Sequence, residues 1–184
     1  FIGAIAVSTN TSDVAFFVAT QLFLSVGFII YYVQKVFDKF KARMVLGGHV
    51  RTLGVDHTSA EVYADVLRMK TFRSVLAVAV QHHNVKIDHW DLKTAFLNAP
   101  MTKLVYAMQP PGYEQEGVAV LRVMKAIYGL PESMRLFVDK LKKDIMDLGF
   151  VQSRADPALY ILKEGDDFMW LPTVVDDLYP VYTS

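Results

Sequence analysis

The sequence contains no cysteine, so disulfide bonds, thiolate zinc sites and cysteine nucleophiles are excluded. It also has no net charge, because 19 Lys and Arg residues balance 19 Asp and Glu residues. A general electrostatic attraction to nucleic acid is therefore excluded, and any such attraction must be local. Hydrophobic residues make up 53% of the chain and charged residues 21%, which excludes intrinsic disorder as a description of the whole.

Charge is missing altogether from one long stretch near the start. Residues 14–34 contain no charged side chain, and a helix of about 20 residues is long enough to cross a bilayer. Asp13 precedes this stretch and basic residues follow it, which by the positive-inside rule would place its C-terminal side in the cytoplasm. The sequence therefore predicts either a membrane-spanning helix over residues 14–33 or two buried strands joined near Gly27.

The pattern after residue 34 is that of a mixed domain of helices and strands. Residues 69–81 have a broad apolar helical face, and residues 85–92 alternate as a strand does. A second helix is predicted between Pro131, at its start, and Gly149, just past its end. Short strands are expected at residues 104–108, 118–123, 158–163 and 168–175.

Two pairs of adjacent aspartates occur near the end of the chain. Asp166 and Asp167 follow a glycine between two predicted strands, where aspartate is favoured in a hairpin turn. Asp176 and Asp177 have apolar residues on both sides, which predicts carboxylates at the tip of a core hairpin. Two like charges there need compensation, and Mg²⁺ prefers carboxylate oxygens.

A third acid, Asp91, closes a predicted strand. The segments around these acids, and others before and between them, resemble the reverse transcriptase of copia-type LTR retrotransposons. The similar segments run in the family's order over residues 35–184. They are KARMV (41–45), GVDHT (54–58), LRMKTFRSVLAVA (67–79), DLKTAFLN (91–98), MQPPGYE (108–114), LRVMKAIYGL (121–130), ADPALYILKEGDDF (155–168) and VVDDL (174–178).

The resemblance implies a right-hand polymerase in which Asp91, Asp176 and Asp177 form the catalytic triad. These acids would bind two Mg²⁺ (or Mn²⁺) ions for an in-line nucleotidyl transfer. The implied partners are an RNA or DNA template-primer and dNTPs. Phe96 matches the aromatic gate beneath the sugar, with core packing as the alternative. Lys41 and Arg43 match basic residues that contact the incoming phosphates, with solvent-exposed charge as the alternative.

Several positions depart from the family pattern. Val174 replaces the usual Tyr before the aspartate pair, and residues 46–51 lack a usual Lys. Glu132 replaces a Gln and would repel a triphosphate. Pro172 lies within the strand that leads to the aspartate pair, where proline is expected to weaken the strand. These departures favour a copy of reduced activity.

The histidines offer one further alternative. His82, His83 and His89 could ligate a metal, but no recognised zinc spacing supports this, so the sequence favours exposed histidines at a helix end.

We therefore expect an α+β fold, a partial right-hand polymerase. Residues 35–184 would form fingers and palm without a thumb, and residues 1–34 an apolar segment. The chain begins with Phe1 rather than Met, which favours a piece of a longer polyprotein. The family implies RNA-directed DNA synthesis in the cytoplasm. Two alternatives stay open: a decayed or truncated transposon fragment without activity, and a membrane-anchored protein whose polymerase-like part only binds.

Overall fold

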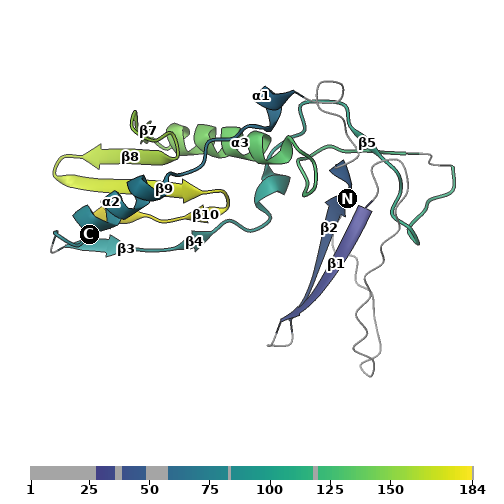
Figure 1. The fold of residues 1–184 in the computed structure, drawn as a ribbon, viewed down its shortest axis with the longest axis horizontal. Coiled ribbons are helices and arrows are strands. Elements are labelled where there is room, and N and C mark those ends of the chain that lie inside the picture. The colour runs from purple at the N-terminus through teal and green to yellow at the C-terminus, as the bar shows by residue number, and fades with distance from the viewer. Residues whose placement is uncertain (1–27, 36–38, 49–57, 83, 118–119, 184) are drawn as a thin grey trace.

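A seven-stranded antiparallel sheet forms one side of the computed structural model, on the left in Figure 1. The structure describes residues 28–35, 39–48, 58–82, 84–117 and 120–183. Strand β9 lies inside the sheet, with β8 on one side and both β10 and β11 on the other. The strands are β3 (Val85–Ile87), β4 (Trp90–Asp91), β7 (Val151–Gln152), β8 (Leu159–Glu164), β9 (Asp167–Val174), β10 (Asp177–Leu178) and β11 (Val181–Thr183).

Two helices cover opposite faces of this sheet. Tyr160 and Leu171 pack with Ile145 of α3 (Ser133–Asp147). Their neighbours along the strands, such as Leu159, pack instead with Val75 of α2 (Met69–Ala79). Because successive side chains of a strand point to opposite faces, α2 and α3 must lie on different sides. The expected α+β class of fold is therefore observed.

Helix α3 lies between Pro131 and Gly149, as predicted. The hydroxyl of Ser133 accepts a hydrogen bond from the Ile127 N–H and donates one to its carbonyl, which fixes the start of the helix. Phe137 and Ile145 are buried. Leu141 is half-buried against two core clusters. Of the lysines on this helix, Lys143 is exposed, whereas Lys140 and Lys142 are half-buried.

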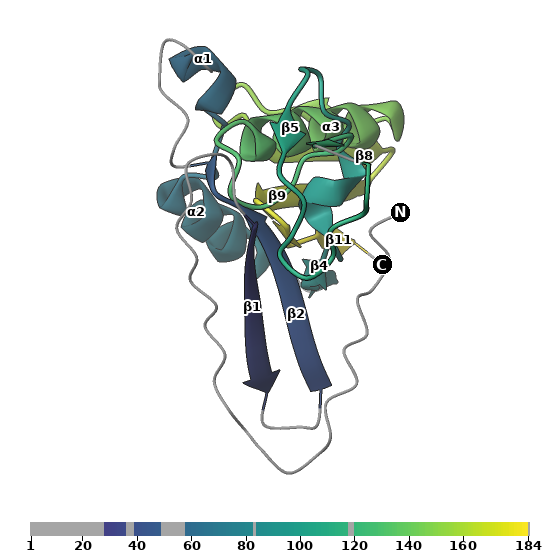
Figure 2. The same ribbon diagram turned by 90° about the vertical axis from the view of Figure 1, so that its right-hand side faces the viewer.

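The N-terminal segment contradicts the expected membrane helix in the part that the structure describes. Residues 28–35 form β1 (Phe28–Lys35), which pairs antiparallel with β2 (Lys39–Leu46). Figure 2 shows this hairpin extending away from α1 and α3. Within the described residues, no helix has both the length and the apolar character needed to cross a bilayer.

Residues 28–35 thus follow the alternative of buried strands that the sequence left open, and their pairing with β2 satisfies the backbone of β1 without a helix. The first part of the predicted span, residues 14–27, lies outside the described residues. The β1–β2 hairpin also continues across the expected boundary between residues 34 and 35, and that division stays a prediction.

The hairpin joins the rest of the chain through two backbones in very close contact. The Leu46 N–H donates to the Tyr128 carbonyl at 2.8 Å. A Cβ atom added at Gly129 would lie 1.8 Å from the Leu46 carbonyl oxygen, and one added at Gly48 would lie 2.0 Å from the Gly129 carbonyl oxygen. Only glycine fits at either position, because the obstructing atoms are backbone.

The remaining elements are short and surround α3. Helix α1 (Ser59–Val62) is joined to α3 by Arg135, whose guanidinium donates to the Tyr63 carbonyl at 3.1 Å. A 3₁₀ helix, η2 (Ala95–Asn98), packs against α3 through small alanines and Phe137. Strands β5 (Tyr106–Ala107) and β6 (Leu121–Arg122) form a separate two-stranded sheet.

Pro172 does not interrupt β9, although proline is rare in central strands. Its carbonyl accepts a hydrogen bond from the Tyr179 N–H at 3.0 Å, so this edge of Pro172 faces the gap between β10 and β11. In an antiparallel sheet the nitrogen and the carbonyl of one residue face the same neighbouring strand. The proline nitrogen, which has no hydrogen to donate, therefore faces the break between β10 and β11, where no regular ladder bond is needed. The strand that leads to Asp176 and Asp177 is therefore continuous despite the proline.

Asp156, before β8, is a fully buried carboxylate that connects the start of α2 to the sheet. It accepts hydrogen bonds from the backbone N–H groups of Arg68, at 3.0 Å, and Ala158, at 3.1 Å. Burial alone would raise the pKa of Asp156, but these bonds and one from the Thr71 side chain lower it below the ordinary value. The charged form is thus the one that the fold stabilises.

Replacement Asp156→Asn should reduce the free energy of unfolding by about 2 kcal/mol at pH 7, because hydrogen bonds to a charge are weakened. Since the folded-state pKa is lowered, the contribution of the carboxylate is complete above the ordinary pKa of about 3.9 and is lost as the pH falls through the folded-state value. Urea unfolding at pH 7 and pH 3 should show the difference from wild type shrinking at the lower pH. The exposed Asp166→Asn is the control, and a difference that is constant with pH would contradict the assignment.

Candidate active site

Two aspartates from distant parts of the chain lie opposite each other on neighbouring strands. β4 and β10 pair antiparallel, with Asp177 opposite Asp91 and Leu178 opposite Trp90. In such a ladder the Cβ atoms of opposed residues are about 4.5–5.5 Å apart. This register sets Asp91 beside Asp177, as the expected site requires, and the sharing of divalent ions by the three carboxylates stays a prediction.

The turn that presents Asp177 has a strained backbone. Val175, between β9 and β10, has a φ of +56°, which is unusual for a β-branched residue. Such a conformation persists only where the surrounding structure holds it. Here the Leu92 N–H donates to the Asp176 carbonyl at 2.9 Å, which ties the turn to the strand that carries Asp91.

Core packing determines which way the opposed acids face. Leu178 is 6% exposed and packs in the cluster that includes Ile145 of α3, and Leu92 packs against the same cluster. Adjacent strand residues point to opposite faces, so Asp91 and Asp177 point away from α3. The Asp91 side chain is exposed, and that of Asp177 is 36% exposed.

An imidazole holds the carboxylate of Asp177. The Nε2 atom of His89 lies 2.7 Å from Asp177 Oδ1. The His89 ring stacks on Tyr179, with centroids 4.8 Å apart and planes within 7°. Tyr179 in turn contacts Phe72 of α2, at a centroid distance of 5.0 Å. The acid is thus connected to α2 through three rings.

The charge arrangement fits a hard cation. Like charges directly opposite each other destabilise a strand pair, and a divalent ion would compensate Asp91 and Asp177. Carboxylate oxygens are the ligands that Mg²⁺ and Mn²⁺ prefer. In the parts of the chain that the structure describes, no three His, Asp or Glu side chains converge as a metal-ligand set. The register thus brings together two of the three predicted acids, Asp91 and Asp177. The third, Asp176, is linked to the strand of Asp91 only by its backbone carbonyl, which accepts the hydrogen bond from the Leu92 N–H.

The other aspartate pair lies at a separate turn, as predicted. Asp166 and Asp167 are both exposed, and Asp167 pairs with Glu164 across the β8–β9 hairpin. The Thr183 hydroxyl donates to Asp167 at 3.0 Å. Turn formation accounts for this pair.

The three residues predicted to contact the nucleotide lie in two elements. Phe96 belongs to η2 and is half-buried, with ring centroids 4.5 Å from Tyr128 and 5.7 Å from Phe137. These contacts are those of the core-packing alternative, and the gate role stays a prediction. Lys41 and Arg43 lie in β2, opposite Val33 and Tyr31, and their side chains lie outside what the structure describes.

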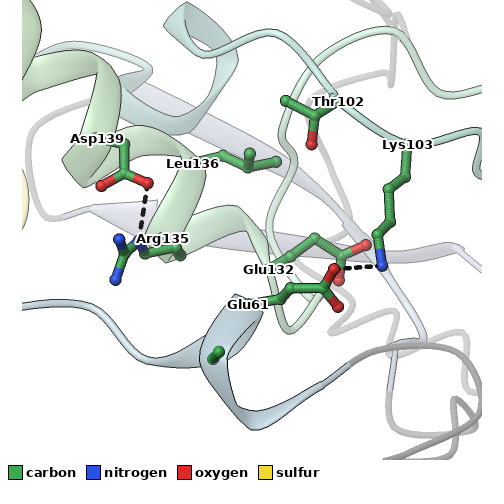
Figure 3. Close-up of a pocket in the computed structure, with 8 residues that line it drawn as sticks. Glu61, Thr102, Lys103, Glu132, Arg135, Leu136 and Asp139 are labelled. Atoms are coloured by element: carbon green, nitrogen blue, oxygen red, sulfur yellow. Dashed lines mark hydrogen bonds and ion pairs between the residues drawn. The ribbon is translucent and has the colours of Figure 1, made fainter.

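Glu132 lies in a charged cleft between α1 and α3, with a volume of about 310 Å³ (Figure 3). It is 5% exposed and lies beside Glu61 and Lys103, whose ion pair measures 2.5 Å. The Lys103 ammonium, followed by the Thr58 N–H, holds the pKa of Glu61 at about 2. The two cations of the cleft, Lys103 and Arg135, form ion pairs with Glu61 and Asp139, and the expected repulsion of triphosphate by Glu132 stays a prediction.

The sequence interpretation missed His89 and Tyr179. His89 is exposed, as expected, but it precedes β4 rather than ending a helix, and it contacts Asp177. The available signal was the alternation of a strand: His89 is two residues before Asp91, and Tyr179 two residues after Asp177. Of the other two histidines, His82 meets the ring of Phe168 edge-on and His83 lies outside the described residues.

The sequence of the chain is similar to those of known proteins. The family model described as "Reverse transcriptase (RNA-dependent DNA polymerase)" matches residues 29–183. The chain is 34% identical over 143 residues to the retrovirus-related Pol polyprotein from transposon RE2 of Arabidopsis thaliana, and 33% identical to that from transposon RE1. Each alignment covers 77% of this chain and 10% of the relative.

A tobacco relative, the retrovirus-related Pol polyprotein from transposon TNT 1-94, is 28% identical over 76% of this chain. The chain spans about a tenth of the length of these curated relatives. No solved structure matches it significantly.

Proposed function

This chain belongs to the reverse transcriptase (RNA-dependent DNA polymerase) family, as part of a copia-type Pol polyprotein, and from that premise we propose that it carries the nucleotidyl-transfer site for RNA-directed DNA synthesis. The observation that supports the proposal is the register that sets Asp91 opposite Asp177. The seven-stranded sheet with α2 and α3 would be the palm, and the β1–β2 hairpin with β5 and β6 would belong to the fingers.

In this proposal Asp91, Asp176 and Asp177 are the catalytic and metal-binding residues. Divalent ions bound there would supply the positive charge that stabilises the reacting phosphate and activates the primer 3′-hydroxyl. The chain's own contribution is to hold acids from two strands at one place before substrate arrives. The buried Leu178 and the Leu92–Asp176 hydrogen bond perform that task.

The remaining contacts would serve the template-primer and the dNTP. Lys41 and Arg43 are proposed to contact the incoming phosphates, because charge-assisted hydrogen bonds to phosphate are strong and fix the position of a substrate. Phe96 is proposed to limit the space beneath the sugar. Its contacts with Tyr128 and Phe137 would hold the ring still, as such a gate requires.

A second candidate is a copy that keeps the fold and binds ions or nucleic acid without catalysis. The departures from the family pattern, Val174 and Glu132 among them, favour this candidate.

Primer extension on an RNA template, with Mg²⁺ or Mn²⁺, tests the proposal. Any extension should fall to background in Asp177→Asn and in Asp176→Asn, because a carboxylate that would bind the ion is lost. The control Asp166→Asn alters an exposed turn acid and should leave extension unchanged. Extension that survives in Asp177→Asn would contradict the assigned site. Absence of extension in the wild-type chain would support the second candidate.

A further inference from the structure

The ring contacts beside the acids suggest a residue with a defined role. We propose that His89 is a positioning residue for Asp177, an outer-shell donor that orients the carboxylate as a ligand for a divalent cation beside Asp91. This inference rests on the proposed function, because it assumes that Asp177 binds the cation. It concerns how the ligand is held and makes no statement about whether this copy extends a primer.

The strand register explains why His89 reaches Asp177. Asp177 is opposite Asp91, so the next pair on the same face sets Tyr179 opposite His89. His89 and Asp177 are then diagonal neighbours across the ladder, a separation that a long side chain can bridge. The observed distance of 2.7 Å between Nε2 and Oδ1 is that of a strong, charge-assisted hydrogen bond.

The direction of this hydrogen bond follows from the acceptor. An ionised carboxylate has no proton to give, so the Nε2 atom of His89 carries the hydrogen and donates it to Oδ1. A carboxylate has two oxygens, and the bond engages one of them. The other, Oδ2, can therefore ligate a cation while His89 fixes the plane of the group.

The ring of His89 is itself held in place. It stacks nearly parallel to Tyr179, which leans on Phe72 of α2. Stacking of this kind restricts rotation of the imidazole although its side chain is 55% exposed. A solvent-exposed ion pair without such support contributes little, so the stack is what makes His89 an effective orienting group.

Manganese binding without nucleotide tests this inference. Titration of the full chain with Mn²⁺, followed by electron paramagnetic resonance, should show a Kd about 10–100-fold weaker in His89→Ala than in the wild type. His89→Gln, whose amide N–H can still donate, should stay within a few-fold of the wild type. Asp177→Asn should also weaken Mn²⁺ binding, which would show that the ion measured is the one bound at this site.

A purely structural role for His89 would not produce this pattern. His89→Ala should unfold at a denaturant concentration close to that of the wild type, because the side chain is exposed. Tyr179→Leu removes the stack, keeps His89 and should weaken Mn²⁺ binding in the same direction, while Tyr179→Phe should not.

Two outcomes would overturn the inference. The first is an affinity of His89→Ala for Mn²⁺ equal to, or tighter than, that of the wild type, since His89 would then be a bystander or a competitor of the cation. The second is Mn²⁺ binding that does not depend on Asp177. Failure of primer extension alone overturns neither the contact nor its role, because ion binding is measured without substrate.

Discussion

Replacement Gly129→Ala should reduce the free energy of unfolding by about 4 kcal/mol or more, a loss large enough to identify a backbone clash. The added Cβ would lie 1.8 Å from the carbonyl oxygen of Leu46. Neither backbone can give way without breaking the hydrogen bond between Leu46 and Tyr128. The φ of +94° adds a conformational cost of about 1–3 kcal/mol for any side chain.

Gly112→Ala is the matched control for this experiment. Gly112 has a similar φ of +82°, but no atom lies within 4 Å of its added Cβ. It should therefore show only the conformational cost, about 1–2 kcal/mol. Urea unfolding followed by circular dichroism measures both variants. Equal losses would mean that the close contact between Gly129 and Leu46 contributes nothing.

Replacement Phe137→Ala should reduce the free energy of unfolding by about 3–5 kcal/mol, because a large buried ring is removed and a cavity remains. Phe137 is 2% exposed and packs against Ala95, Ala99 and Ala126. The methyl groups of these alanines are too short to fill the space that the ring leaves, so a cavity is expected to remain. The measurement is denaturant unfolding at neutral pH.

Met146→Ala is a control from the same helix, since the Met146 side chain is 45% exposed. Its cost should stay below about 1 kcal/mol. Phe137→Ala should also change the surroundings of Phe96, whose ring meets that of Phe137 edge-on at 5.7 Å. A small loss of stability in Phe137→Ala would mean that η2 and α3 are not held together by this ring.

Much of the central fold could be predicted from the sequence because its elements have strong local patterns. Both long helices occur where apolar residues recur at helical spacing, and α3 ends before Gly149 as predicted. The apolar run before residue 34 has no such period. Its composition suits a membrane helix and a strand equally. Residues 28–35 form a strand because their backbone pairs with β2, a contact that the composition of the run does not predict.

The candidate site was predictable in part for a similar reason. The acids could be found because apolar neighbours and a family pattern flank them, and the structure sets Asp91 opposite Asp177. The contact between His89 and Asp177 depends on the register between two strands, which no local pattern fixes. Likewise, the tolerance of β9 for Pro172 depends on a gap in the neighbouring strand.

The distance along the chain between the two halves of the site has a consequence during synthesis. His89 and Asp177 are 88 residues apart, so at about 5–20 residues per second the ribosome needs roughly 4–18 s to supply the second strand after the first. During that interval β3 and β4 lack partners, and their Ile87 and Trp90 side chains are exposed even in the finished fold. An unpaired strand with apolar side chains is a template for association with other chains. The nascent chain is therefore most prone to misassembly at the strand that will carry Asp91, in the seconds before its partner emerges.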